Sequence, residues 1–223
     1  MLDILGQSEY GLYSLAQSAV SYLSLLSFGF GSTIIRYIAK YRAEGNKEAV
    51  EKTYGFFILL YSILALLVLA VGFLISNNVE PIFHRGLTAD EQAKMRILVL
   101  IMTVNSALSF PVSVFSSMIT AYERYIYRKL IDMLATVGAP IANLIALYMG
   151  YASIGMSVAA TVIQFIMLPL YAGYCFKALK LRPRFSILPK PLVKELFGFS
   201  AFIFLGSLVD MLFWSTDKVI LGM

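Results

Sequence analysis

Residues 53–78, TYGFFILLYSILALLVLAVGFLISNN, run for 26 positions without a charged side chain. A helix needs about 20 predominantly apolar residues to cross the hydrocarbon core of a bilayer. The stretch is long enough to do so, and it lacks the alternation of apolar and polar residues that marks a strand of a membrane barrel. It therefore predicts a membrane-spanning α-helix.

The rest of the chain has the same character. Its 223 residues are 59% hydrophobic and only 14% charged, and the mean hydropathy is +0.78, outside the range of soluble globular domains. Stretches with few or no charges lie at 10–35, 53–78, 97–122, 130–150, 152–176 and 197–221. Because only helices and closed barrels satisfy their backbone hydrogen bonds inside a bilayer, we expect an all-α, polytopic membrane protein with about six transmembrane helices.

Basic residues are distributed unevenly between the connections of these predicted helices. Fourteen lie in alternate connections: Arg36, Lys40, Arg42, Lys47, Lys52, Arg124, Arg128, Lys129, Lys177, Lys180, Arg182, Arg184, Lys190 and Lys194. Three lie in the connection between the second and third helices: Arg85, Lys94 and Arg96. Short loops rich in Lys and Arg stay in the cytoplasm, so we expect the first group inside and the segment before residue 10 outside. The net charge of +5 would suggest a nucleic-acid partner in a soluble protein, but here the basic residues act as topology signals. We therefore expect membrane lipids, and no nucleic acid, as partners.

Polar side chains repeat at helical spacing on one face of several predicted helices. Gln17 lies on such a face of the first helix, Asn105 on that of the third and Asn143 on that of the fourth. The serines and threonines of these faces are explained by helix packing, where hydroxyls form hydrogen bonds across the interface. On another face of the fourth helix, Gly138, Ala142 and Ala146 predict a packing seam of small residues.

Two carboxylates, Asp132 and Asp210, lie within apolar stretches. A lone charge at the centre of a membrane helix costs about 2.5–3.5 kcal/mol on insertion scales, so each should face a partner, water or a transport path. Asp132 is near the inner end of its helix and has Arg128 and Lys129 as alternative partners. The pattern leaves open whether these carboxylates are structural or bind a coupling ion.

Several classes of function lack their sequence signatures. There is no phosphate-binding G-x-x-x-x-G-K-[ST] loop and no H-E-x-x-H zinc motif, and the chain has one histidine, His84, and one cysteine, Cys175. No G-x-S-x-G motif indicates a hydrolase nucleophile. We therefore expect a protein that is not an enzyme and has no cofactor or metal.

Three segments resemble a known family: LGQSEYGLYSLAQSAVSYLSLLSFGFGSTIIRYIAKYRAEGNKE at 5–48, KPLVKELFGFSAFIFLG at 190–206 and STDKVILGM at 215–223. They are similar to the flippases that export lipid-linked oligosaccharides for polysaccharide and O-antigen synthesis, within the multidrug/oligosaccharidyl-lipid/polysaccharide superfamily. The matching positions are Leu5-Gly6, Tyr10-Gly11, Gly29, Gly31, Arg36 and Thr216-Asp217-Lys218. The resemblance covers almost the whole chain.

The resemblance implies a two-lobed, MATE-like transporter whose lobes rock about a central cavity. It assigns 1–196 to the second to sixth helices of the N-terminal lobe, without the first helix, and 197–223 to a truncated first helix of the C-terminal lobe. The implied substrate is a polyprenyl-pyrophosphate-linked oligosaccharide, which crosses the plasma membrane by alternating access. Polysaccharide polymerase or other assembly proteins are implied as partners.

Site residues follow from this substrate. The resemblance implies that Arg36 neutralises the pyrophosphate, with Arg124 and Lys129 at the cytoplasmic mouth, and that Gln17, Asn105 and Asn143 contact sugar hydroxyls. Two alternatives remain open. One is a cation-coupled multidrug exporter of the same superfamily, in which Asp132 and Asp210 bind the coupling ion. The other is a membrane subunit that does not transport.

Overall fold

The computed structural model describes the backbone of residues 2–27, 29–83, 87–186 and 189–221, and the side chains of residues 6–23, 26–27, 29–81, 87–186, 189–190 and 192–209. The helices are α1 (Leu2–Ser24), the 3-10 turn η1 (Leu25–Ser27), α2 (Phe30–Ala43), α3 (Lys47–Asn77), α4 (Val79–Phe83), α5 (Ala89–Ala121), α6 (Tyr125–Tyr148), α7 (Ala152–Gly173), the π-helical turn η2 (Tyr174–Ala178) and α8 (Lys190–Leu221). Within these residues, five helical segments are long and apolar enough to cross a membrane: Lys47–Asn77, Ala89–Ala121, Tyr125–Tyr148, Ala152–Ala178 and Leu192–Val209. The predicted all-α, polytopic fold is confirmed.

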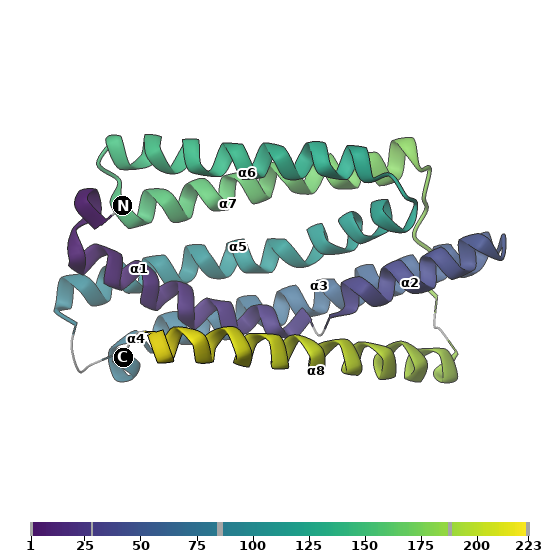
Figure 1. Cartoon of the computed structure of the whole chain (residues 1–223), viewed down its shortest axis with the longest axis horizontal. Coiled ribbons are helices and arrows are strands. Elements are labelled where there is room, and N and C mark those ends of the chain that lie inside the picture. Colours follow the sequence, from purple (N-terminus) through teal and green to yellow (C-terminus); the bar gives the residue numbers. More distant parts are fainter. Residues whose placement is uncertain (1, 28, 84–86, 187–188, 222–223) are drawn as a thin grey trace.

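The long helices lie side by side, and α5 is at the centre (Figure 1). It packs against α1, α2, α3 and α7, while α6 covers α7 and α8 runs along α2. The connections α2–α3, α5–α6 and α7–α8 lie at one end of the bundle, and the N-terminus, α4 and the α6–α7 turn lie at the other (Figure 1). The structure thus gathers the three Lys- and Arg-rich connections at one end, which we call the basic end.

The first predicted span, 10–35, is not one helix. α1 ends at Ser24, a 3-10 turn follows, and α2 begins after Gly29, whose φ of 66° is left-handed. A side chain at Gly29 would overlap Ile203 of α8, so this position needs glycine both for its backbone conformation and for the close approach of α8. The apolar composition of the stretch conceals the break, because hydropathy does not register backbone conformation.

The helix predicted at 53–78 is buried in the protein on one side only. Tyr54, Phe57 and Tyr61 of α3 are buried in the core, whereas Leu66 and Phe73 are more than half exposed. A helix that is apolar all round supplies one face to the core and the other to lipid, so its composition does not show which residues are buried.

The small-residue seam that the sequence predicts on the fourth helix takes part in close helix packing at only one of the two positions tested, Ala146 and Gly138. Gly155 of α7 lies against Ala146 of α6, a member of the predicted small-residue seam, but a methyl group added at Gly138 would meet nothing within 4 Å. A close approach also occurs between Gly72 of α3 and Thr103 of α5, where an added methyl group would overlap the threonine side chain. This contact contributes to the α3–α5 interface.

Candidate functional site

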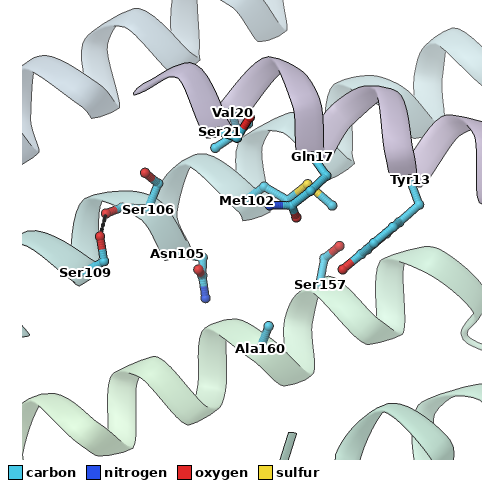
Figure 2. A pocket seen from close by; sticks show the side chains of 10 residues that line it. All are labelled: Tyr13, Gln17, Val20, Ser21, Met102, Asn105, Ser106, Ser109, Ser157 and Ala160. Carbon is cyan, nitrogen blue, oxygen red and sulfur yellow. Dashed lines mark hydrogen bonds between the residues drawn. The ribbon is translucent and has the colours of Figure 1, made fainter. Parts of the chain in front are cut away.

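A polar pocket of about 230 Å³ lies between α1, α5 and α7 (Figure 2). It is lined by Tyr13, Gln17, Val20, Ser21, Met102, Asn105, Ser106, Ser109, Ser157 and Ala160. α1 and α5 supply most of the polar side chains, and Ala160 of α7 is a small residue on the opposite wall. A pocket with this many polar groups within an apolar helical bundle is a candidate binding site.

Two of the sequence-predicted residues meet in this pocket. Gln17 extends from α1 and Asn105 from α5 into the space in front of α7 (Figure 2). Side chains from two polar faces that were identified separately in the sequence therefore line the same pocket. Each amide has two N–H donors and one carbonyl acceptor, so the pair offers donors and acceptors from two directions.

The serines of the pocket present mainly their oxygen lone pairs. The Ser157 hydroxyl donates to the Ser153 carbonyl at 3.0 Å, and the Ser109 hydroxyl donates to the Ser106 carbonyl at 2.6 Å. Both hydroxyl protons are used within their own helices, so the oxygens remain as acceptors for a ligand. None of the lining residues in the described part of the chain is charged. The arrangement suits a neutral ligand rich in hydroxyl groups.

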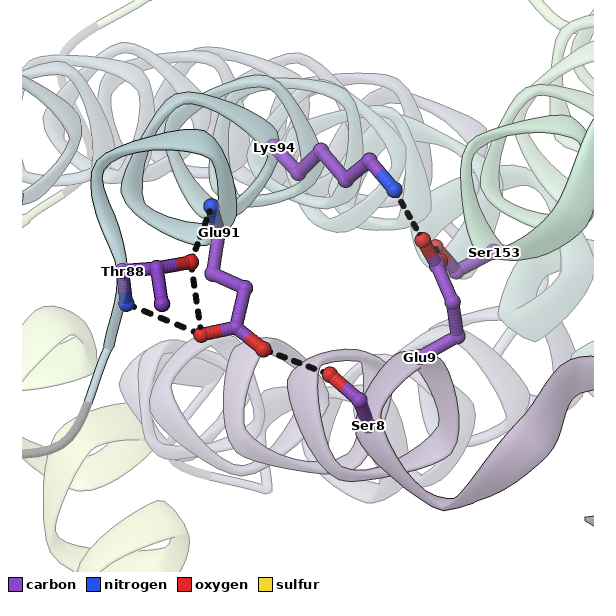
Figure 3. A network of polar contacts seen from close by, with 6 residues as sticks. All are labelled: Ser8, Glu9, Thr88, Glu91, Lys94 and Ser153. Carbon is purple, nitrogen blue, oxygen red and sulfur yellow. Dashed lines mark hydrogen bonds and ion pairs between the residues drawn. The ribbon is translucent and has the colours of Figure 1, made fainter.

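A network of polar contacts joins the same three helices at the end away from the basic end (Figure 3). Glu9 of α1 pairs with Lys94 of α5, and its other oxygen accepts a hydrogen bond of 2.6 Å from Ser153 of α7. The Ser8 hydroxyl donates to Glu91 at 2.5 Å, and Glu91 caps the start of α5. The network fixes the spacing of α1, α5 and α7 on one side of the pocket.

Glu9 precedes the first predicted span, and its pKa reflects this network. Burial alone would raise the pKa of its carboxyl, but hydrogen bonds from Lys94 and Ser153 and the positive charge of Lys94 outweigh burial and lower it. Glu9 is therefore held as a carboxylate whose charge is matched by Lys94.

Arg36 does not line the pocket. It lies exposed on α2, and its guanidinium carbon is 4.3 Å from the centroid of the Phe199 ring of α8. The aromatic face stabilises a cation without neutralising it, so the charge remains available to an anion. The structure thus separates Arg36 from Gln17 and Asn105, which the sequence had assigned to one substrate.

Arg124 and Lys129 lie at the basic end, and both are exposed. Arg124 immediately precedes α6 and borders a second hollow of about 290 Å³, whose wall includes the stacked rings of Tyr127 and Tyr174. They too are separate from the pocket.

Asn143 lies on α6, which contributes no residue to the pocket lining. Its Oδ1 atom is buried and has no hydrogen-bond partner among the described residues. The structure therefore does not bring Asn143 together with Gln17 and Asn105.

The structure describes the side chain of one of the two carboxylates in the apolar stretches, Asp132, but not that of Asp210. Asp132 accepts a hydrogen bond of 2.5 Å from the Tyr171 hydroxyl of α7 and lies 3.7 Å from Arg128, one of its two expected partners. These contacts link α6 to α7. The side chain of Asp210 lies outside the described residues.

Several lining residues were not singled out from the sequence, Tyr13 and Ala160 among them. Tyr13 is four positions before Gln17, so it shares the face of α1 that carries the polar stripe. The spacing of four residues could therefore have identified Tyr13 as a residue of the same polar face. Ala160 gave none, because a single alanine in an apolar helix is not distinctive.

The fold defines the class of this chain as a multi-pass helical membrane protein with a polar pocket between its helices. Residues 3–223 match the family described as "polysaccharide biosynthesis protein". The match spans almost the entire chain, and the chain belongs to this family, which supports a role in polysaccharide synthesis or export. No curated protein and no solved structure matches it.

Proposed function

We propose that this protein acts in flipping a polyprenyl-pyrophosphate-linked oligosaccharide across the plasma membrane, for the assembly of cell-surface polysaccharide. The observation that carries the proposal is the uncharged pocket between α1, α5 and α7, in a chain of the polysaccharide biosynthesis family. Hydroxyl and amide groups inside an apolar bundle match the hydroxyls of a glycan head group, which must leave water to cross the bilayer.

The two charged phosphates need cations, and the basic end supplies them. Arg36 is the proposed contact because its guanidinium is exposed and is held in place by Phe199. Arg124 and Lys129 are proposed to receive the head group as it enters. The basic end faces the cytoplasm in this proposal, because Lys- and Arg-rich loops are retained there.

Alternating access supplies the movement in the proposed mechanism. In the proposed arrangement, residues 1–196 belong to one lobe and residues 197–223 to the other, and the contact between α2 and α8 joins the two. The head group crosses within the cavity while the polyprenyl tail stays in lipid. Transport of this kind makes and breaks no covalent bond.

The test is translocation in proteoliposomes, using a fluorescent polyprenyl-pyrophosphate oligosaccharide whose outward-facing fraction is quenched by an impermeant reductant. Arg36→Ala is expected to reduce the translocation rate at least about tenfold, since a desolvated phosphate charge is left unpaired. Lys40→Ala is the matched control, because Lys40 is exposed on the same helix one turn further on. Wild-type rates for a well-inserted Arg36→Ala protein would remove Arg36 from the site, and no translocation by the wild-type protein would refute the flippase proposal.

A further inference from the structure

We propose that the pocket between α1, α5 and α7 binds a single uncharged pyranose ring, with Tyr13 as the flat surface under the ring and Gln17 and Asn105 as partners of its hydroxyls. The inference rests on the proposed function, since it names the part of the glycan that this pocket takes. It also adds a requirement for neutrality that the flippase proposal does not contain.

The size of the pocket limits the ligand. Clefts that enclose a drug-sized ligand measure roughly 300–1,000 Å³. The volume here is about 230 Å³, smaller than that range. One sugar ring is therefore the natural occupant, and the remaining sugars of an oligosaccharide lie outside this pocket.

Tyr13 has the chemistry of a sugar platform. A pyranose is amphipathic, because its ring faces carry C–H groups and its rim carries hydroxyls. Tyr13 is half-buried and packs against the cluster of Leu147 and Met156, so its ring is held in place from behind. In Figure 2 the ring extends into the space bordered by Gln17 and Ser157. An aromatic ring of this kind offers an apolar surface and a polar tip.

The polar partners surround that surface. Neither the Gln17 amide nor the Asn105 amide forms a hydrogen bond with another residue in the described ranges, so the donors and acceptors of both are available to a ligand. Ser109 and Ser157 contribute acceptor oxygens. Neutral donors and acceptors from three helices match hydroxyls that both donate and accept.

Charge sets the specificity. No described lining residue carries a charge, and Glu9, one turn before Tyr13 on α1, is neutralised by its ion pair with Lys94. A carboxylate on the bound ring would therefore be desolvated without a cation beside it. The pocket should accept a neutral hexose and reject the matching uronic acid.

The experiment measures sugar binding without transport. The protein in lipid nanodiscs is titrated with methyl β-D-glucopyranoside, methyl β-D-galactopyranoside, methyl α-D-mannopyranoside and methyl β-D-glucopyranosiduronate, and saturation-transfer NMR reports contact with each. At least one neutral glycoside is expected to bind, with the uronate at least about tenfold weaker than the glucoside when the glucoside is a ligand.

Four variants separate the platform from general effects. Tyr13→Leu is expected to weaken binding about tenfold, Tyr13→Phe to retain most of it, and Ala160→Phe to abolish it by filling the pocket. Tyr22→Leu is the matched control, because Tyr22 is 61% exposed on the same helix and does not line the pocket.

The outcomes distinguish this inference from the flippase proposal. No binding by any neutral glycoside, equal binding of uronate and glucoside, or unchanged binding by Tyr13→Leu and Ala160→Phe overturns the inference, even if lipid-linked glycan is translocated. Selective binding that depends on Tyr13 supports it. If such binding occurs while lipid-linked glycan is not translocated, the pocket stands and the flippase proposal fails.

Discussion

The side-chain oxygens of Thr33 on α2 and Ser200 on α8 lie 2.6 Å apart, and both residues are buried. One turn further along α2, the Tyr37 hydroxyl donates to Glu195 of α8 at 2.9 Å. Thr33 lies one turn after the break at Gly29, where an added side chain would overlap Ile203 of α8. In the proposed transporter, the contact between Thr33 and Ser200 lies at the junction between the two lobes, and it is closed in this structure.

A covalent link across that junction should stop transport. The proximity of the Thr33 and Ser200 side chains suits a disulfide, which requires Cβ atoms about 3.8 Å apart. We expect the Thr33→Cys/Ser200→Cys protein to lose translocation on oxidation and to regain it on reduction. The measurement is the proteoliposome assay under both conditions.

Either single cysteine variant is the control, since neither can form the intramolecular bond. The native Cys175 is fully buried and is not expected to interfere. Unchanged transport by the oxidised protein, with the disulfide verified by mass spectrometry, would show that α2 and α8 do not separate in the cycle.

Helix packing gives a second prediction, at Gly72. Gly72→Ala should destabilise the protein by about 1–3 kcal/mol, because the added methyl group overlaps Thr103 in a packed interface. Gly138→Ala is the matched control, since a methyl group there meets nothing within 4 Å. Removing a flexible glycine from a helix is expected to stabilise the control by up to about 1 kcal/mol. Thermal unfolding in detergent measures both, and equal melting temperatures would contradict the tight α3–α5 contact.

The sequence was sufficient for the class of fold but not for the details of the pocket. Charge-free stretches such as 53–78 identify membrane helices because the bilayer imposes one length and one polarity on every span. Gln17 and Asn105 were identified from helical periodicity alone. The separation of these two residues from Arg36 could not be identified from the sequence, because it depends on the break at Gly29. Left-handed backbone geometry leaves no signal in hydropathy. The position of Tyr13 in the pocket wall could be recognised only from the structure, because it depends on how α1 packs against α7.

The network around Glu9 predicts a dependence of stability on pH. Because its pKa in the folded protein is below its ordinary value of 4.5, the unfolded chain binds this proton more tightly. The stabilisation is therefore present above about pH 4.5 and is lost as the pH falls through the lower, folded-state value. Lys94 is about half exposed, so solvent screening limits the effect to about 1 kcal/mol or less.

Melting temperatures of the wild type and of Glu9→Gln between pH 3 and pH 7 check this prediction. The wild type should be the more stable at pH 7, and the difference should shrink toward pH 3. Lys94→Met should reduce the pH dependence as well, because it removes the main cation near Glu9. A constant difference between wild type and Glu9→Gln would show that the charge of Glu9 contributes nothing.

Asp132 offers a direct test of whether a carboxylate drives transport. In the structure it accepts the Tyr171 hydrogen bond that links α6 to α7, and the carbonyl of an asparagine can accept the same bond. If this contact is the role of Asp132, Asp132→Asn retains most of the translocation rate, whereas Asp132→Leu leaves the buried Tyr171 hydroxyl unpaired and destabilises the protein by about 1–3 kcal/mol. If Asp132 binds a coupling cation, both variants lose transport that is driven by an ion gradient, because neither can carry the charge. Comparing the two variants with and without an imposed gradient decides between a structural and a coupling role.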